Sequence, residues 1–186
     1  ALLKETGIRD GYALFYGIGD GNLLEALAIN SELHIVAADP DDRVVAAMRR
    51  RFERAGLYGS RVAILRGDPL SLGLPPYMAS LTVVNGLDAR KYPPDRTLME
   101  RLAAPMRPYG GKTVFTGAGY DVAKISGPAK EISAAGLTMS ASGAFPTVTR
   151  EGALPGSSSW THNYGDIANT SKSDDSLVSL PLGLLW

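Results

Sequence analysis

Short apolar runs alternate with helical patterns over the first 116 residues of the chain. The runs are rich in branched and aromatic side chains, which is typical of buried strands. They lie at Tyr12–Tyr16, Leu33–Ala38, Val62–Leu65, Leu81–Val84 and Thr113–Thr116. Because strands that alternate with helices form βαβ units, this pattern predicts an α/β, Rossmann-like, doubly wound sheet whose first five strands are parallel.

Helices are predicted between these runs, where apolar residues recur at helical spacing. Asp41 and Asp42 precede one of them and suit its positively charged end. Another follows Pro93-Pro94-Asp95. The three apolar faces comprise Leu23, Leu24 and Leu27, then Val44, Val45, Met48 and Phe52, and last Leu98, Met99 and Leu102.

The pattern changes after Thr116. A helix is predicted around Ala129 to Ala135, ended by Gly136. Two alternating segments follow, Thr138–Ser142 and Thr147–Arg150, on either side of a Gly143-Ala144-Phe145-Pro146 turn. They predict an antiparallel hairpin that closes one edge of the sheet.

From Glu151 onward the chain is rich in serine and lacks helical or strand periodicity until Leu177. Residues 1–150 are therefore predicted to form one Rossmann domain and residues 151–186 an irregular linker or lead-in. The last residues turn apolar and end in Leu184-Leu185-Trp186, so we expect the natural protein to continue.

Composition excludes several function classes. Nineteen basic and nineteen acidic residues leave no net charge, which disfavours nucleic acid as a partner. The chain has no cysteine and two histidines, so we expect no metal centre. No apolar run approaches the roughly 20 residues that span a bilayer, and we expect no membrane span.

A glycine-rich turn lies between the first strand and the first helix, with the sequence Tyr16-Gly17-Ile18-Gly19-Asp20-Gly21-Asn22. Glycines there allow a sharp turn and the close approach of a ligand beside the positive end of a helix. The same residues also suit a tight turn without a ligand. A dinucleotide fingerprint would need glycine at position 22, where the chain has Asn22, so an NAD-dependent oxidoreductase is disfavoured.

Two carboxylates follow the next two strands. Asp39, in Asp39-Pro40, stands twenty positions after Gly19 and could accept the hydroxyls of a ribose or cap a helix. Asp68, in Gly67-Asp68-Pro69, could accept the amine of an adenine or form an ordinary turn. Because the carboxyl ends of parallel strands meet at one edge, these residues and Asn85 are expected to converge on one crevice.

Taken in order, these features resemble class I S-adenosylmethionine-dependent methyltransferases over about residues 8 to 150. The resemblance implies a seven-stranded sheet of order 3-2-1-4-5-7-6 with an antiparallel last strand, and S-adenosylmethionine as cofactor. It implies that residues 16–21 bracket the aminoacyl part of the cofactor and that Asp39 with Pro40 holds the ribose. Asp68 with Pro69 would meet the adenine edge, and Asn85 would lie near the methyl group.

The chain departs from the family at three places. Phe15 stands where the family usually has an acid for the ammonium group, and Ser80 where an acid is also common. Asn85 is followed by Gly86-Leu87-Asp88, so the amine-methylating motif is absent. Asp20, Asp88 and Tyr92 are candidate bases, but no catalytic residue is assigned. A methyltransferase with an unidentified acceptor and a non-catalytic Rossmann-like scaffold or docking module are both open.

A second resemblance lies in the tail, in Trp160-Thr161-His162-Asn163-Tyr164, Asp166, Ala168-Asn169-Thr170 and the residues from Leu180 to Trp186. These look like the lead-in to a pyrroloquinoline-quinone-type β-propeller, which follows a methyltransferase-like domain in large bacterial proteins. The resemblance implies a C-terminal propeller beyond Trp186, without the quinone as a ligand of these residues. It also implies export, whereas S-adenosylmethionine implies a cytoplasmic location.

Overall fold

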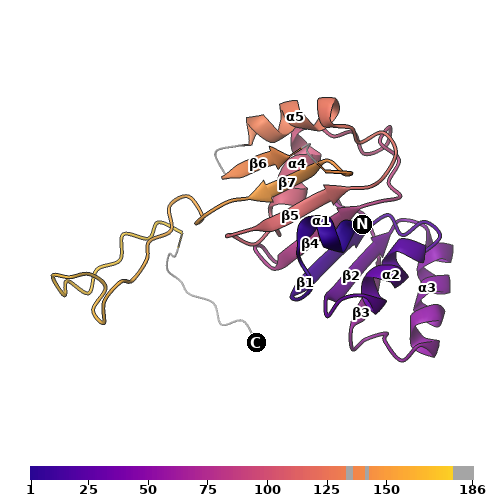
Figure 1. Cartoon of the computed structure of the whole chain (residues 1–186), viewed down its shortest axis with the longest axis horizontal. Helices are drawn as coiled ribbons and strands as arrows, with labels where there is room; N and C mark the ends of the chain where they lie inside the picture. Colours follow the sequence, from indigo (N-terminus) through magenta and orange to yellow (C-terminus); the bar gives the residue numbers. More distant parts are fainter. Residues whose placement is uncertain (133–135, 141–142, 178–186) are drawn as a thin grey trace. The chain divides into compact units, whose positions relative to one another are not determined.

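The computed structural model describes residues 1–132, 136–140 and 143–177. Residues 1–152 form one compact unit and residues 153–186 a second. The described part of the first unit holds a seven-stranded sheet of order β3-β2-β1-β4-β5-β7-β6 (Figure 1). Its strands are β1 (Tyr12–Tyr16), β2 (His34–Asp39), β3 (Val62–Arg66), β4 (Ala79–Val84), β5 (Gly111–Phe115), β6 (Leu137–Ser140) and β7 (Thr147–Arg150).

The pairing of the strands confirms the predicted fold class. β1 pairs in parallel with β2 and β4, β2 with β3, and β4 with β5. β7 runs antiparallel to both β5 and β6, so it is the reversed strand of the sheet. Strands β1 to β4, which precede the predicted ligand-binding residues, therefore end at the same edge of the sheet.

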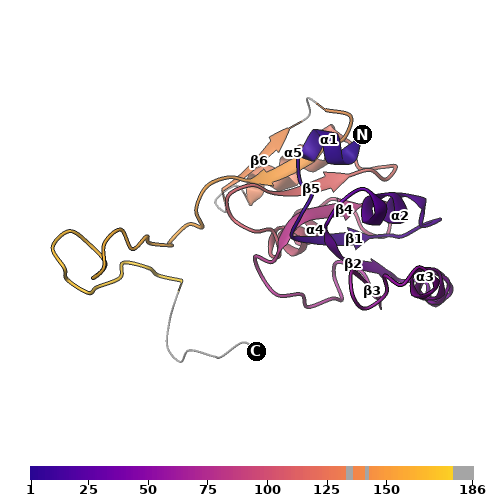
Figure 2. The ribbon, with the colours of Figure 1, turned by 60° about the horizontal axis from the view of Figure 1, so that its bottom comes forward.

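Alternation along the strands divides the core into two apolar layers, one on each face of the sheet. Helices cover both faces (Figure 2). Phe15 and its neighbours pack with α1 (Leu2–Thr6), α2 (Asn22–Ile29) and α3 (Asp42–Arg54). Tyr16 faces the other way, toward α4 (Arg96–Ala103) and α5 (Val122–Glu131). The first helix, α1, has five residues and was not predicted.

The predicted start of the fifth helix was wrong. α5 begins at Val122, where the side chain of Asp121 accepts a hydrogen bond from the backbone N–H of Lys124, rather than near Ala129. Pro128 lies inside the helix although proline removes a backbone donor there. Ile125 and Ala129 are buried against the sheet, and this packing outweighs the local preference. Positions 133–135 of the predicted helix and 141–142 of the predicted strand lie outside the described residues.

The described part of the second unit, residues 153–177, contains turns and one isolated bridge between His162 and Gly165. Of the helices in the described ranges, none is both long enough and apolar enough to cross a bilayer.

Candidate functional site

Gly17 brings the turn after β1 into direct contact with the loop after β4. Its carbonyl accepts a hydrogen bond of 2.8 Å from the N–H of Gly86. Its φ is +77°, and a Cβ there would lie 2.6 Å from backbone atoms of Gly86 and Leu87. A side chain is therefore excluded by backbone conformation and by backbone contact at once. Gly17 is buried, and its role is to let two loops pass closely.

Gly19 has a different environment. Its φ is +61°, and only Asn85 Nδ2 lies within 4 Å of where a Cβ would be, at 3.8 Å. Gly19 is exposed, and α2 begins three residues later, where the N–H of Asn22 donates to Oδ1 of Asp20 at 3.0 Å. The positive helix end thus lies beside a surface that a ligand can approach.

Asp39 connects the end of β2 to the glycine turn. Its Oδ2 accepts a hydrogen bond of 2.8 Å from Ile18 N–H, and its Oδ1 accepts one of 2.9 Å from Asp41 N–H. The helix cap is Asp41, whose side chain accepts from Arg43 N–H. Asp39 is buried, and each of its oxygens has a second lone pair that could accept a hydroxyl group.

Asp68, after β3, is half-buried. Its Oδ1 accepts hydrogen bonds from Leu70 N–H and Ser71 N–H, and its Oδ2 accepts one of 3.1 Å from the hydroxyl of Tyr92. Burial acts to raise the pKa of Asp68, but these hydrogen bonds outweigh it and hold the pKa below its ordinary value. The group is a charged acceptor at neutral pH.

Asn85 links the ends of three strands. Its Nδ2 donates to the carbonyl of Gly17 at 3.2 Å, and its Oδ1 accepts from the hydroxyl of Thr116 at 2.9 Å. Its backbone N–H donates to the carbonyl of Tyr16. The side chain thus fixes the glycine turn against the ends of β4 and β5.

A cavity of about 480 Å³ opens beside Asn85, between the loops that follow β4 and β5. Asp88 and Arg90 lie in its lining and form an ion pair of 3.5 Å. Of the three candidate bases, only Asp88 is among its lining residues. Asp20 accepts a hydrogen bond from Asn22 N–H within its own turn, and Tyr92 is buried. The full lining comprises residues 85–90, Ala118 and Gly119.

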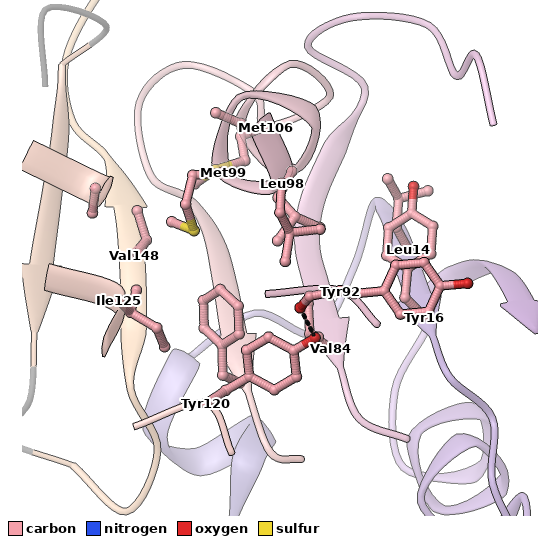
Figure 3. Packing of buried hydrophobic residues seen from close by; sticks show 14 of the residues in the cluster. Leu14, Tyr16, Val84, Tyr92, Leu98, Met99, Met106, Tyr120, Ile125 and Val148 are labelled. Atoms are coloured by element: carbon pink, nitrogen blue, oxygen red, sulfur yellow. Dashed lines mark hydrogen bonds between the residues drawn. The ribbon is translucent and has the colours of Figure 1, made fainter. Parts of the chain in front are cut away.

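Three tyrosines pack behind this edge of the sheet (Figure 3). Tyr16, Tyr92 and Tyr120 are each 3% exposed, and the hydroxyl of Tyr120 donates to the carbonyl of Tyr92 at 2.7 Å. Burial, followed by the negative charge of Asp68, raises the pKa of Tyr16 to about 12. The sequence assigned Tyr120 no role, since a tyrosine in a loop carries no local signal of burial.

Phe15 is fully buried in the apolar layer beneath α2 and α3. A carboxylate at this position would be desolvated, so the substitution of the usual family acid by phenylalanine agrees with its surroundings. Ser80 is also buried, and its hydroxyl lies against the backbone of Gly11.

No protein-family model and no curated protein matches the sequence. Solved structures do match the fold. One is a candidate S-adenosyl-L-methionine-dependent methyltransferase from Methanococcus maripaludis, with a TM-score of 0.69 and 18% identity over 82% of this chain and 83% of that one. Another is a SAM-dependent methyltransferase from Aquifex aeolicus, with a TM-score of 0.61 and 16% identity over 80% of this chain and 85% of that one.

A third structure is phosphoethanolamine N-methyltransferase 2 from Haemonchus contortus in complex with S-adenosyl-L-methionine. Its TM-score is 0.54 at 20% identity, over 61% of this chain and 26% of that one. The described chain therefore has the Rossmann-like fold of SAM-dependent methyltransferases. At these identities the likeness shows the fold alone.

The residues present fit the adenosine half of S-adenosylmethionine. Asp39 and Asp68 supply carboxylates at the ends of β2 and β3, and Gly19 leaves an open approach beside the start of α2. Position 15 supplies no acid for the ammonium group. Among the residues that the structure describes, no three metal-binding side chains gather in one place.

Proposed function

We propose that residues 1–152 bind S-adenosylmethionine at the edge where β1 to β4 end, and that they transfer its methyl group to a small-molecule or protein acceptor. The observation that supports this best is the placement of Asp39 and Asp68 at the ends of β2 and β3, in a fold shared with SAM-dependent methyltransferases. Asp39 accepts from Ile18, the residue before the exposed Gly19.

In this proposal the turn from Tyr16 to Gly21 holds the aminoacyl part of the cofactor. Asp39 with Pro40 accepts the ribose hydroxyls, and Asp68 with Pro69 meets the adenine edge. Asn85 keeps the turn in place beside the cavity, which would receive the acceptor. S-adenosylmethionine supplies an electrophilic methyl group on a positively charged sulfur, so the chain has to position a nucleophile and exclude water. No residue is assigned as the base.

A non-catalytic scaffold is the second candidate. It is favoured by Phe15, and by the hydrogen bonds that already engage the carbonyl of Gly17 and both oxygens of Asp39. In this case the fold would position other domains of a longer protein without binding a nucleoside.

Thermal unfolding with S-adenosylmethionine, S-adenosylhomocysteine and NAD separates the two candidates. At a hundred times the dissociation constant, binding adds about 2.7 kcal/mol, which raises the midpoint of a domain of this size by several degrees. We expect a shift with the two adenosyl ligands and none with NAD. An unchanged midpoint with all three would favour the scaffold.

The ribose assignment has its own variant, Asp39→Asn, which removes the charge. The amide has one acceptor oxygen for the two backbone N–H groups that Asp39 accepts, so a urea unfolding curve checks that the turn keeps its stability. We expect it to weaken adenosyl binding by about 1.5–3 kcal/mol, the scale of a hydrogen bond to a charged group. Asp10→Asn, at an exposed aspartate before β1, is the matched control and should leave the affinity unchanged. Equal affinity in the two variants would remove the ribose assignment.

We also propose that residues 153–186 lead into a β-propeller in the natural protein, as the tail motif from Trp160 to Thr170 suggests. An antibody raised against residues 1–152 should then detect, in cells of the source organism, a protein far larger than 19.7 kDa. A band near that mass would contradict the proposal.

A further inference from the structure

The two carboxylates at the proposed site, Asp39 and Asp68, differ in the kind of group that donates hydrogen bonds to them. Asp39 accepts from two backbone N–H groups, which belong to the turns that shape the site. Oδ1 of Asp68 likewise accepts from its own turn, but its Oδ2 accepts from a side chain that lies 24 residues away, on the loop between β4 and α4. A side-chain donor can leave without remodelling the turn that holds Asp68.

Tyr92 is held in this position by packing and by its own backbone. Its side chain is 3% exposed and lies beside Tyr16 and Leu14 (Figure 3). Its N–H donates to the carbonyl of Asp88, and its carbonyl accepts the hydroxyl of Tyr120 (dashed line in Figure 3). The ring thus fills buried space next to Asp68, and its hydroxyl donates to Oδ2 of that carboxylate.

We propose that Tyr92 is an internal competitor for Asp68: its hydroxyl shares the oxygen that the exocyclic amine of an adenine would use, so a nucleoside obtains the whole charge of that oxygen only by displacing Tyr92. This inference rests on the proposed function, because it concerns the same adenine subsite. An O–H donor and an amine N–H donor satisfy the same oxygen, and a carboxylate left without either at a half-buried position is costly.

Displacement has a structural consequence for the loop. The backbone carbonyl of Tyr92 is held by the hydroxyl of Tyr120. Tyr92 can therefore leave Asp68 in two ways. A rotation of its side chain is the smaller movement, and an opening of the loop of residues 88–92 is the larger one. Either movement shifts the loop whose exposed residues Asp88 and Arg90 line the cavity.

The test is Tyr92→Phe in the full chain, which removes the hydroxyl and keeps the buried ring. Without its internal donor, Asp68 gains more from the ligand, and we expect the dissociation constant of S-adenosylhomocysteine, measured by calorimetry, to fall about tenfold, equivalent to about 1.4 kcal/mol. A urea unfolding curve checks that the variant is folded. Tyr58→Phe is the control, since it removes a tyrosine hydroxyl from an exposed position away from Asp68 and Tyr92.

A second ligand identifies the group that competes. In the analogue with an unsubstituted purine, which lacks the exocyclic amine, Tyr92→Phe should give little or no gain. Three outcomes would each overturn the inference while leaving the proposed function standing: an equal gain with both ligands, an equal gain in Tyr58→Phe, or no gain in Tyr92→Phe. Failure of both the wild-type chain and Tyr92→Phe to bind S-adenosylhomocysteine would overturn the proposed function and the inference with it.

Discussion

At the scale of single residues, Gly17 and Gly19 of the turn after β1 have different structural roles. Gly17 is buried against the backbone of the loop after β4, whereas Gly19 is exposed with open space around it. Both have positive φ values, so both resist substitution. Only Gly17 faces a rigid neighbour as well, because backbone atoms cannot rotate away as a side chain can.

This difference predicts the stability of two variants. Gly19→Ala should lower the free energy of unfolding by roughly 1–2 kcal/mol, the cost of a left-handed conformation. Gly17→Ala adds the collision with Gly86 and should cost roughly 2–5 kcal/mol. Urea denaturation of both variants provides the measurement. Equal losses would show that the backbone of Gly86 and Leu87 can move away from the added methyl group without lowering the free energy of unfolding.

Tyr16 makes the stability of the domain depend on pH. Its folded pKa is about 12, above the value of about 10 for an unfolded chain, so folding favours the protonated hydroxyl. The contribution is complete below about pH 10 and is lost as the pH rises from there through about 12. Over that range the wild-type chain should lose up to about 2–3 kcal/mol more stability than Tyr16→Phe, measured by urea unfolding.

Tyr58→Phe, at an exposed tyrosine, is the control for the alkaline experiment. Its pH dependence should follow that of the wild-type chain. If Tyr16→Phe does the same, burial of Tyr16 does not govern the loss at high pH.

At the scale of elements, the short helix α1 is tied to the hairpin of β6 and β7. The carboxylate of Glu5 accepts hydrogen bonds from Ala144 N–H at 3.1 Å and from Phe145 N–H at 3.3 Å. Lys112 Nζ donates to the carbonyl of Thr6 at 2.8 Å. These bonds join the first residues of the chain to strands that follow more than a hundred positions later.

Glu5→Ala should therefore loosen the turn of that hairpin. Without the carboxylate, the amides of Ala144 and Phe145 lose their acceptor, and we expect their hydrogen exchange to become faster while exchange in β1 is unchanged. Glu53→Ala, at an exposed glutamate of α3, is the matched control. Unchanged exchange at both amides in Glu5→Ala would show that the hydrogen bonds to Glu5 do not stabilise the turn.

At the scale of the whole molecule, the core belongs to the first unit. Within the described ranges, every buried hydrophobic residue lies between Leu2 and Val148. The described part of the second unit instead exposes large side chains, among them Trp160, Tyr164 and Ile167. The free energy that holds the sheet together thus comes from residues 1–152.

A chain of residues 1–152 should consequently fold alone. Because it keeps both apolar layers and all seven strands of the described sheet, we expect its free energy of unfolding to lie within about 1 kcal/mol of that of the full chain. Chemical denaturation of the two chains is the measurement. A larger loss would place residues after Gly152 in the core.

The fold was predictable because its signals are local. Strand and helix periodicity identified the seven strands and all helices but α1. The order of the strands followed from the family resemblance, which rests on the glycine turn and on the acidic residues after the strands. α5 was misplaced because Gly127 and Pro128 signal a break, whereas the burial of Ile125 and Ala129 is a tertiary effect. Within the site, the sequence placed Asp39, Asp68 and Asn85 after successive strands.

The chain's own pattern thus determined which residues reach the edge of the sheet, since side-chain periodicity and turn chemistry act between near neighbours. Only the tertiary structure decided what those residues bind. The bond from Tyr92 to Asp68 spans 24 positions, and the bond from Asn85 to Gly17 spans 68. Such contacts depend on how loops pack after the sheet has formed, and no local pattern encodes them.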